Sequence, residues 1–297
     1  MVRAGDPDEE DFPNLKKRVD KLASPLYYTA SLSALRIADL LIKIGADVNE
    51  CSPAGKYGNA LQAAAYDENE SIVQLLIGKD ANVNAQGGQY GNALQAAAYK
   101  GNESMVQLLI GKGANVNAQR GQYGNALQAV AYKGNKRIVL LLIGKDANVN
   151  AQGGEYGNAL QAAAYCEHKS IVRLLLDNGA DINAQGGEYG NALQAAVAGN
   201  KLDIARLLLS RGARVDPPGA EWEELLTRLV KSGSSTAPAG RLRKFREDPA
   251  GFLAALTLVD SDSNSESGSG CHSGDDGDVD GDSDGDSDSD GDSDGDD

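Results

Sequence analysis

The feature that most constrains the fold of this chain is a sequence that recurs every 33 residues. The string YGNALQA begins at five positions, Tyr57, Tyr90, Tyr123, Tyr156 and Tyr189. The second half of the unit recurs as well, as SIVQLLIGKDANVNAQGG from Ser71 and SMVQLLIGKGANVNAQRG from Ser104. A unit of this length is too short to bury a core by itself. The units must therefore stack and share one continuous core.

Each unit predicts two short helices and a turn. Asn59 is a helix cap, and Gln62, three residues later, is placed to reach back in a capping-box arrangement. The second helix has an apolar side made of Ile72, Val73, Leu75, Leu76 and Ile77. It ends at a glycine, such as Gly113 or Gly179, where a left-handed cap is needed. The polar stretch AQGGQYG then turns into the next unit. The prediction is an all-α repeat solenoid.

These units resemble ankyrin repeats, and six of them fit residues 24–218. Ser24-Pro25-Leu26-Tyr27 stands at the family's Thr-Pro-Leu-His position, and the endings GADVN and GADIN match the family closely. The YGNALQAA form is similar to arrays of filamentous-fungal proteins, where the array often follows a nucleotide-binding NACHT domain. The resemblance implies a helix-turn-helix array that binds another protein through its concave face. The chain itself has no GxxxxGK[ST] motif, and hence no P-loop.

The flanking segments are expected to close the array. Residues 1–23 predict an N-terminal capping helix that opens near Asp11 and places Leu15, Val19 and Leu22 on one face. Residues 219–259 predict a degenerate seventh repeat that serves as the C-terminal cap. Residues 260–297, called here the acidic tail, are almost entirely Asp, Ser and Gly. Such a composition cannot bury a core, so the acidic tail is expected to be disordered.

The charge of the chain is unevenly distributed. The formal net charge is −15, but the acidic tail alone holds 15 Asp, one Glu and no Lys or Arg, which leaves −15 + 16 = +1 for the rest. A neutral body argues against a specific nucleic-acid binder. The N-terminus carries no secretory signal, and no apolar run is long enough to span a membrane. Together with three widely spaced cysteines, Cys51, Cys166 and Cys271, this predicts a cytoplasmic or nuclear protein. We expect the array to be monomeric.

No catalytic constellation is evident in the sequence. His168 falls in the turn between two helices, where a turn or solvent-facing residue is expected, and nearby Cys166 lacks a third orienting group. The acidic tail imitates the start of an EF-hand loop but has Gly291 where the loop needs Glu. We therefore expect no enzyme activity, cofactor, metal site, small-molecule substrate or membrane partner. Four tail serines with Asp three residues later are candidate phosphorylation sites, namely Ser283, Ser287, Ser289 and Ser293.

The resemblance also implies which residues face a partner. On the first helix these are Tyr66, Tyr99, Tyr132 and Tyr165, followed at the next position by Asp67, Lys100 and Lys133. At the turn tips they are Gln89, Gln122, Glu155 and Glu188. The tyrosines of the YGNALQA string are expected to form a structural ladder instead. For the first-helix tyrosines two interpretations stay open, a contact surface of rigid aromatic rings or packing against the next copy.

The leading functional hypothesis is a non-enzymatic interaction module, or scaffold, for another protein. One alternative is the ligand-sensing part of a fungal receptor of the NACHT type. Another is a protein whose acidic tail shields basic partners, in which case binding would weaken steeply with salt. A separate expectation concerns Asp80 and Asp146, which occupy the left-handed slot of Gly113 and Gly179. Replacing Asp80 by Gly is expected to raise the melting temperature.

Overall fold

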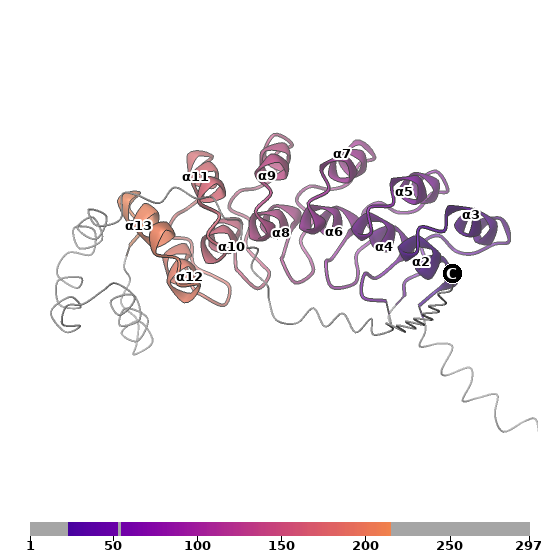
Figure 1. Cartoon of the computed structure of the whole chain (residues 1–297), viewed down its shortest axis with the longest axis horizontal. Helices are drawn as coiled ribbons and strands as arrows, with labels where there is room; N and C mark the ends of the chain where they lie inside the picture. The colour runs from indigo at the N-terminus through magenta and orange to yellow at the C-terminus, as the bar shows by residue number, and fades with distance from the viewer. Residues whose placement is uncertain (1–22, 53–54, 215–297) are drawn as a thin grey trace, which may run out of the picture.

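The computed structural model describes residues 23–52 and 55–214, and these form a row of helix pairs (Figure 1). The inner helices are α2 (Pro25–Ser31), α4 (Ala60–Tyr66), α6 (Ala93–Lys100), α8 (Ala126–Lys133), α10 (Ala159–Tyr165) and α12 (Ala192–Ala198). The outer helices are α3 (Leu35–Lys43), α5 (Glu70–Ile77), α7 (Glu103–Gly111), α9 (Lys136–Ile143), α11 (Lys169–Asp177) and α13 (Leu202–Ser210). The fold is therefore an all-α repeat array of paired helices, as the sequence predicted.

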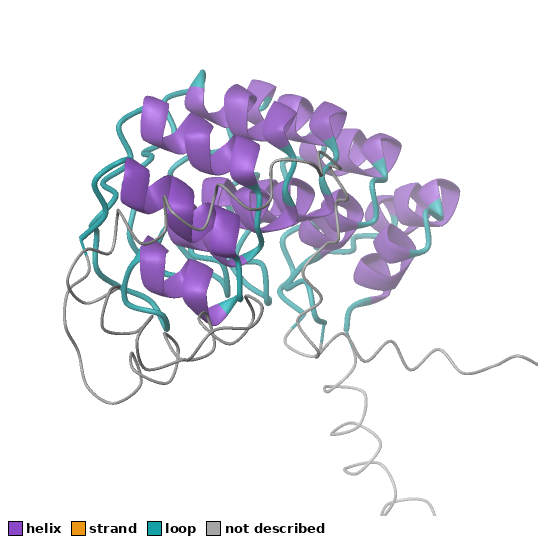
Figure 2. Cartoon of the chain, turned by 60° about the vertical axis from the view of Figure 1, so that its left-hand side comes forward, coloured by secondary structure: helices purple, strands orange, loops and turns teal. Residues whose placement is uncertain are grey.

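The two rows of helices form two layers, with loops along the edges (Figure 2). The loops that leave α5, α7, α9 and α11 each form a hairpin-like turn below the inner helices and then enter the next unit (Figure 1). We call the residues at the ends of these turns the hairpin tips. The array thus has two long surfaces. The outer face is made by the outer helices, and the hairpin edge, on the opposite side, is made by the hairpin tips.

The core explains why the inner helices are so rich in alanine. Every residue of α4 from Ala60 to Ala65 is buried, because this helix packs between its neighbours α2 and α6 and against its own outer helix α5. A helix buried on all sides has no polar face. The outer helices bury only one stripe, which in α5 consists of Ile72, Val73 and Leu76.

The helix starts confirm the predicted caps but correct the predicted capping box. The Asn59 side chain accepts the backbone N–H of Gln62 at 2.9 Å. Gln62 does not reach back: its Nε2 donates to the carbonyl oxygens of Ala85, Gly87 and Gly91 in the following unit, at 3.1–3.3 Å. These carbonyls belong to the next hairpin. The Gln62 side-chain amide bonds to them and not to the start of its own helix. Only in α12, among the described helices, does Gln194 complete the box, with Oε1 accepting from the Asn191 N–H.

The predicted left-handed slot after the outer helix is confirmed. Gly113 and Gly179 have φ of 88° and 83°, and Asp80 and Asp146 adopt 66° and 61° in the same slot. A side chain at Gly113 would meet no atom within 4 Å. The slot therefore selects glycine by backbone conformation and not by lack of space.

The first helix pair, α2 and α3, has a stacking surface that no other described helix pair covers. Ile37 of α3 is 54% exposed, whereas Ile72 and Met105 at the equivalent position are 1% and 0% exposed. Leu40 of α3 is likewise exposed. Several predictions concern residues outside the described ranges. These are the capping helix before residue 23, the degenerate repeat at 219–259, the acidic tail at 260–297 and its serines Ser283, Ser287, Ser289 and Ser293.

Candidate functional site

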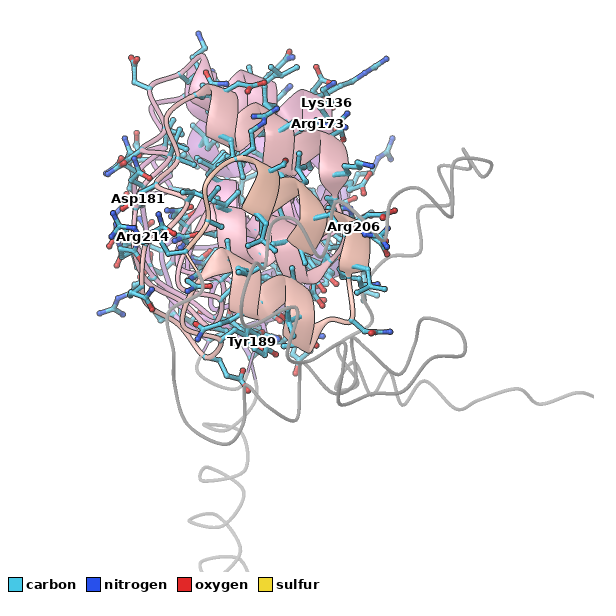
Figure 3. The ribbon with its side chains drawn as sticks, turned by 90° about the vertical axis from the view of Figure 1, so that its left-hand side faces the viewer. Lys136, Arg173, Asp181, Tyr189, Arg206 and Arg214 are labelled. Carbon is cyan, nitrogen blue, oxygen red and sulfur yellow. The ribbon has the colours of Figure 1, made fainter. Side chains whose placement is uncertain are left out.

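The tyrosines predicted at the binding face form a continuous stack with those predicted as a structural ladder. Tyr57 lies ring to ring with Tyr66 at 4.4 Å, Tyr66 with Tyr90 at 5.0 Å, and Tyr90 with Tyr99 at 4.8 Å. The same alternation continues through Tyr123, Tyr132, Tyr156, Tyr165 and Tyr189, with neighbouring centroids 4.8–5.5 Å apart. Its last member, Tyr189, lies on the side of the hairpin edge (Figure 3). Spacings of this size are those of favourable aromatic contacts.

Burial within this stack corrects one expectation. Tyr99 and Tyr132 are only 5% and 1% exposed, although the resemblance implied an exposed position for them. Tyr66 and Tyr165 are half-buried. The reason is geometric: each of these rings lies between two tyrosines of the YGNALQA strings. Tyr99, for example, contacts both Tyr90 and Tyr123. The first-helix tyrosines therefore contribute to packing between units.

The stack also favours the neutral form of the buried Tyr90 and Tyr123 hydroxyl groups. Burial raises the pKa of Tyr90, and a hydrogen bond with the Tyr66 hydroxyl raises it further. The pKa of Tyr123 is raised in the same way, first by burial and then by its hydrogen bond with Tyr99. A phenolate in this column would be both desolvated and close to other phenols. The surroundings of Tyr90 and Tyr123 therefore favour neutral phenols.

Two lysines at the ends of inner helices lie over rings of the stack. The Nζ of Lys100 lies 4.6 Å from the centroid of the Tyr66 ring, and that of Lys133 lies 4.4 Å from the Tyr99 ring. Both lysines are exposed. Each one therefore reaches back over a ring of the preceding unit in cation–π geometry and keeps its charge in water. The structure places both predicted lysines at the surface where a partner can reach them.

The equivalent position in other units carries different chemistry. Asp67 is half-buried, and burial raises the pKa of its carboxyl, which Lys100 partly offsets. Cys166 is 2% exposed and so is part of the packing. This position therefore changes from an acid, through two bases, to a buried thiol along the array.

The hairpin tips form a second continuous row. The backbone N–H of Gln89 donates to the carbonyl of Lys56 at 2.9 Å, and three further bonds of 2.9 Å repeat this link from Gln122 to Glu188. The side chains join too, since Gln89 Nε2 donates to Gln122 Oε1 and Gln122 Nε2 donates to Glu155 Oε2, both at 2.8 Å. The four predicted tip residues, Gln89, Gln122, Glu155 and Glu188, are thereby brought into one line.

A glycine that the sequence interpretation treated only as a turn residue makes this row possible. A Cβ on Gly88 would lie 2.2 Å from the Tyr57 carbonyl carbon, and one on Gly121 would lie 2.4 Å from that of Tyr90. Backbone thus touches backbone at each hairpin. The signal was present in the sequence as the recurring QGG and QRG strings, but it did not show which atoms approach.

A ladder of asparagines on the loops after the outer helices was also missed. Asn84 Nδ2 donates to the Gly113 carbonyl at 3.0 Å, and its Oδ1 accepts the Asn115 N–H at 2.7 Å. Asn49, Asn117 and Asn150 make the same pair of bonds. The recurring final Asn of the GADVN and GANVN strings was a signal for this role.

His168 lies in a turn, as predicted, but does not simply face solvent. It is half-buried, its Nε2 lies 2.9 Å from the Tyr132 carbonyl oxygen, and its ring lies against Gly134. Burial lowers the pKa of the imidazole. Its neutral form, donating from Nε2 to Tyr132, fits this site. His168 is thus another contact between units, and it has no catalytic geometry.

The comparison with protein families settles what kind of array this is. The description "Ankyrin repeats (3 copies)" matches residues 26–120 and again residues 126–218, which together exceed half of the chain. The chain belongs to the ankyrin repeat family. This ankyrin repeat protein matches no curated protein.

Among solved structures, it is similar to the crystal structure of the human ASB11 ankyrin repeat domain. The TM-score is 0.57 at 20% identity, and the match covers 72% of this chain and 100% of that one. A likeness at this identity supports the fold alone. Within residues 23–52 and 55–214, no helix is long and apolar enough to cross a membrane. The same residues hold no group of three or more His, Cys, Asp or Glu side chains placed to bind a metal ion.

Proposed function

We propose that this ankyrin repeat protein is a non-enzymatic module that binds another protein through its hairpin edge. The proposed surface comprises the hairpin tips and the adjoining ends of the inner helices. Its exposed charges are Lys100, Lys133 and Glu188, with half-buried Asp67 and Glu155 beside them. Half-buried Tyr66 and Tyr165 add partly accessible rings, while Tyr99 and Tyr132 support the surface from below.

The observation that carries this proposal is the continuous row of linked tips. The backbone bonds from Lys56 to Glu188 and the side-chain bonds from Gln89 to Glu155 fix neighbouring tips relative to one another. Side chains on such a frame lose little conformational freedom when a partner binds. Rigid presentation of repeated positions is what an extended binding surface needs.

Charge along this edge suggests the chemistry of the partner. Lys100 and Lys133 lie in the middle of the array, and Glu155 and Glu188 follow toward its C-terminal end. A partner segment with acidic residues opposite the lysines and basic residues opposite the glutamates would match this order. The lysines are exposed, so their contribution would be stronger in association rate and orientation than in affinity.

A charge-reversal experiment tests the proposed surface. Lys100→Glu/Lys133→Glu is compared with Lys112→Glu/Lys145→Glu, which makes the same charge change on the loops after α7 and α9. Proteins captured from lysate of the source cells are then quantified for both variants, after thermal melting shows that both fold. We expect a partner that the control retains and the edge variant loses. Identical recovery with both variants would reject the hairpin edge as the binding surface.

The two alternative functions receive no support from the array geometry. A receptor-sensor role depends on segments other than this chain, and the shielding role depends on the acidic tail, which lies outside the described residues. We therefore propose the binding module alone.

A further inference from the structure

Because the units are nearly identical, the residues at equivalent positions of the outer face can be compared directly. The outer helices α5 and α7 begin with Glu70-Ser71 and Glu103-Ser104. At the same two positions α9 has Lys136-Arg137, and α11 has Lys169-Ser170. Four residues after the first position, Gln74 and Gln107 are replaced by Leu140 and Arg173. At these positions α9 and α11 therefore carry cations where α5 and α7 carry glutamate, serine or glutamine.

These changes create a basic patch, defined here as Lys136, Arg137, Lys169 and Arg173. All four side chains are exposed. Lys136 and Arg173 lie on the outer side of the array, away from the hairpin edge, on whose side Tyr189 lies (Figure 3). Helices α9 and α11 are neighbours in the outer row (Figure 1). The patch therefore lies on two neighbouring outer helices and is separate from the proposed hairpin edge.

The four cations of the basic patch form no salt bridge with any described residue. Near the end of the array, by contrast, Arg206 bonds to Asp203 at 2.9 Å and Arg211 to Asp177 at 3.2 Å. Glu70 and Glu103 belong to α5 and α7, and Asp177, the one carboxylate of α11, is the residue that pairs with Arg211. Glu167 precedes α11 but pairs with Lys201 at 3.1 Å. The basic patch thus concentrates positive charge that the described residues leave uncompensated.

We propose that the basic patch docks the chain's own acidic tail, residues 260–297. Charge complementarity selects this occupant, because the acidic tail holds 15 Asp and one Glu without a single cation. Reach allows it as well. Residues 215–259 separate the tail from Arg214, and random-coil statistics give a chain segment of this length an end-to-end distance of roughly 40 Å. The patch lies on α9 and α11, and α11 contacts α13, which ends just before Arg214.

The hairpin edge is a poorer site for the same tail. Lys100 and Lys133 already lie over tyrosine rings, and Glu155 and Glu188 would repel the tail along the same edge. Docking on the outer face leaves the hairpin edge free. Because the contact is between exposed charges, it weakens as salt rises. Phosphorylation of the tail serines would add negative charge and strengthen it.

Photocrosslinking in the full chain tests the proposal. A benzophenone maleimide is attached to Cys271 of the tail in a Cys51→Ser/Cys166→Ala background. Crosslinked peptides are then mapped by mass spectrometry. We expect crosslinks to α9 and α11 within single chains at low salt, and at least a several-fold loss of them in high salt.

The array itself supplies a variant that is expected to fold. Lys136→Glu, Arg137→Ser, Lys169→Glu and Arg173→Gln give α9 and α11 the residues that α7 already carries at these positions. This variant should lose the crosslinks to the outer face. Lys79→Glu/Lys112→Glu/Lys145→Glu makes the same change in net charge at exposed positions after the outer helices, and it should keep them.

Several results would overturn the proposal. Crosslinks that fall on the hairpin edge or on residues 241–246 would place the tail elsewhere. Crosslinks found only in dimers would mean docking between chains. Equal crosslinking in both charge variants, or none in the parent chain, would exclude the basic patch as the docking surface. The proposed binding at the hairpin edge is tested separately, by its own variants.

Discussion

At the residue scale, this array shows how one backbone slot accepts two kinds of side chain at different cost. Gly113 and Asp80 occupy equivalent positions with φ of 88° and 66°. Asp tolerates left-handed backbone better than most residues, but glycine adopts it without a Cβ penalty. The Asp80 carbonyl accepts Asn49 Nδ2, a bond that does not depend on the side chain at residue 80. Replacing Asp by Gly at this position therefore measures the free-energy cost of the left-handed backbone conformation.

We predict that Asp80→Gly/Asp146→Gly stabilises the array. Relief of left-handed strain should contribute about 0.5–1 kcal/mol for each site, less the extra unfolded-state entropy of glycine. This corresponds to a rise in melting temperature of a few degrees, at roughly 2–4 °C per kcal/mol. The reciprocal change Gly113→Asp should lower it. An unchanged or lower melting temperature in the double variant would show that Asp80 and Asp146 are not strained.

His168 predicts a pH dependence of stability. Because burial lowers its folded-state pKa, the unfolded chain takes up the proton first as pH falls below the ordinary value of 6.5. The free energy of unfolding should therefore decline from pH 6.5 downward, above the range in which most carboxylates titrate. His168→Asn, which restores the residue found at 69, 102 and 135, should flatten this decline. Matching profiles from denaturant titrations of both proteins would contradict the account.

At the element scale, amide side chains connect one helix pair to the next. Gln128 Nε2 donates to the carbonyls of Ala151, Gly153 and Gly157 at 3.0–3.3 Å, and Gln128 is only 2% exposed. Gln194 occupies the same position in α12 but bonds within its own unit. Substitutions at Gln128 and Gln194 can therefore compare a side chain that joins two units with one that caps its own helix.

We predict that Gln128→Leu destabilises the array more than Gln194→Leu. The first change leaves buried carbonyls without their donor, at a cost of about 1–3 kcal/mol. The second removes one half of a capping box and should cost about 0.5–1 kcal/mol. Urea unfolding followed by circular dichroism measures both. Equal losses would mean that the bonds to the next hairpin add nothing beyond helix capping.

The sequence predicted much of this element-level structure, but not where shared side chains point. Periodicity and caps predicted the helix pairs, and the slot of Gly113 predicted the conformation of Asp80. Periodicity alone left Tyr99 open, because a repeated tyrosine fits both a presented residue and a stacked one. Gln62 was assigned to its own helix because capping boxes are local. The carbonyls that it binds lie 23–29 residues away and become visible only when the units are stacked.

At the scale of the whole molecule, the tyrosine stack joins the described helix pairs into one structure. It runs from Tyr27 of the first pair to Tyr189, which precedes the last. The hairpin edge lies on this stack, and the basic patch lies on the outer face. In this account the tyrosines join the units, Tyr66 and Tyr165 add partly accessible rings, and recognition depends mainly on the charged side chains around them.

The most direct test of that claim is an alkaline titration of the tyrosines, followed by tyrosinate absorbance and circular dichroism together. Tyr90, Tyr123 and Tyr156 have raised folded-state pKa values, so their stabilising effect is complete below the ordinary value of 10.0 and is lost as pH rises above it. We predict that these tyrosines stay neutral past pH 10.0 and ionise only as the helices unfold cooperatively. Ionisation of all eleven tyrosines near pH 10.0 with the helices intact would contradict the stack.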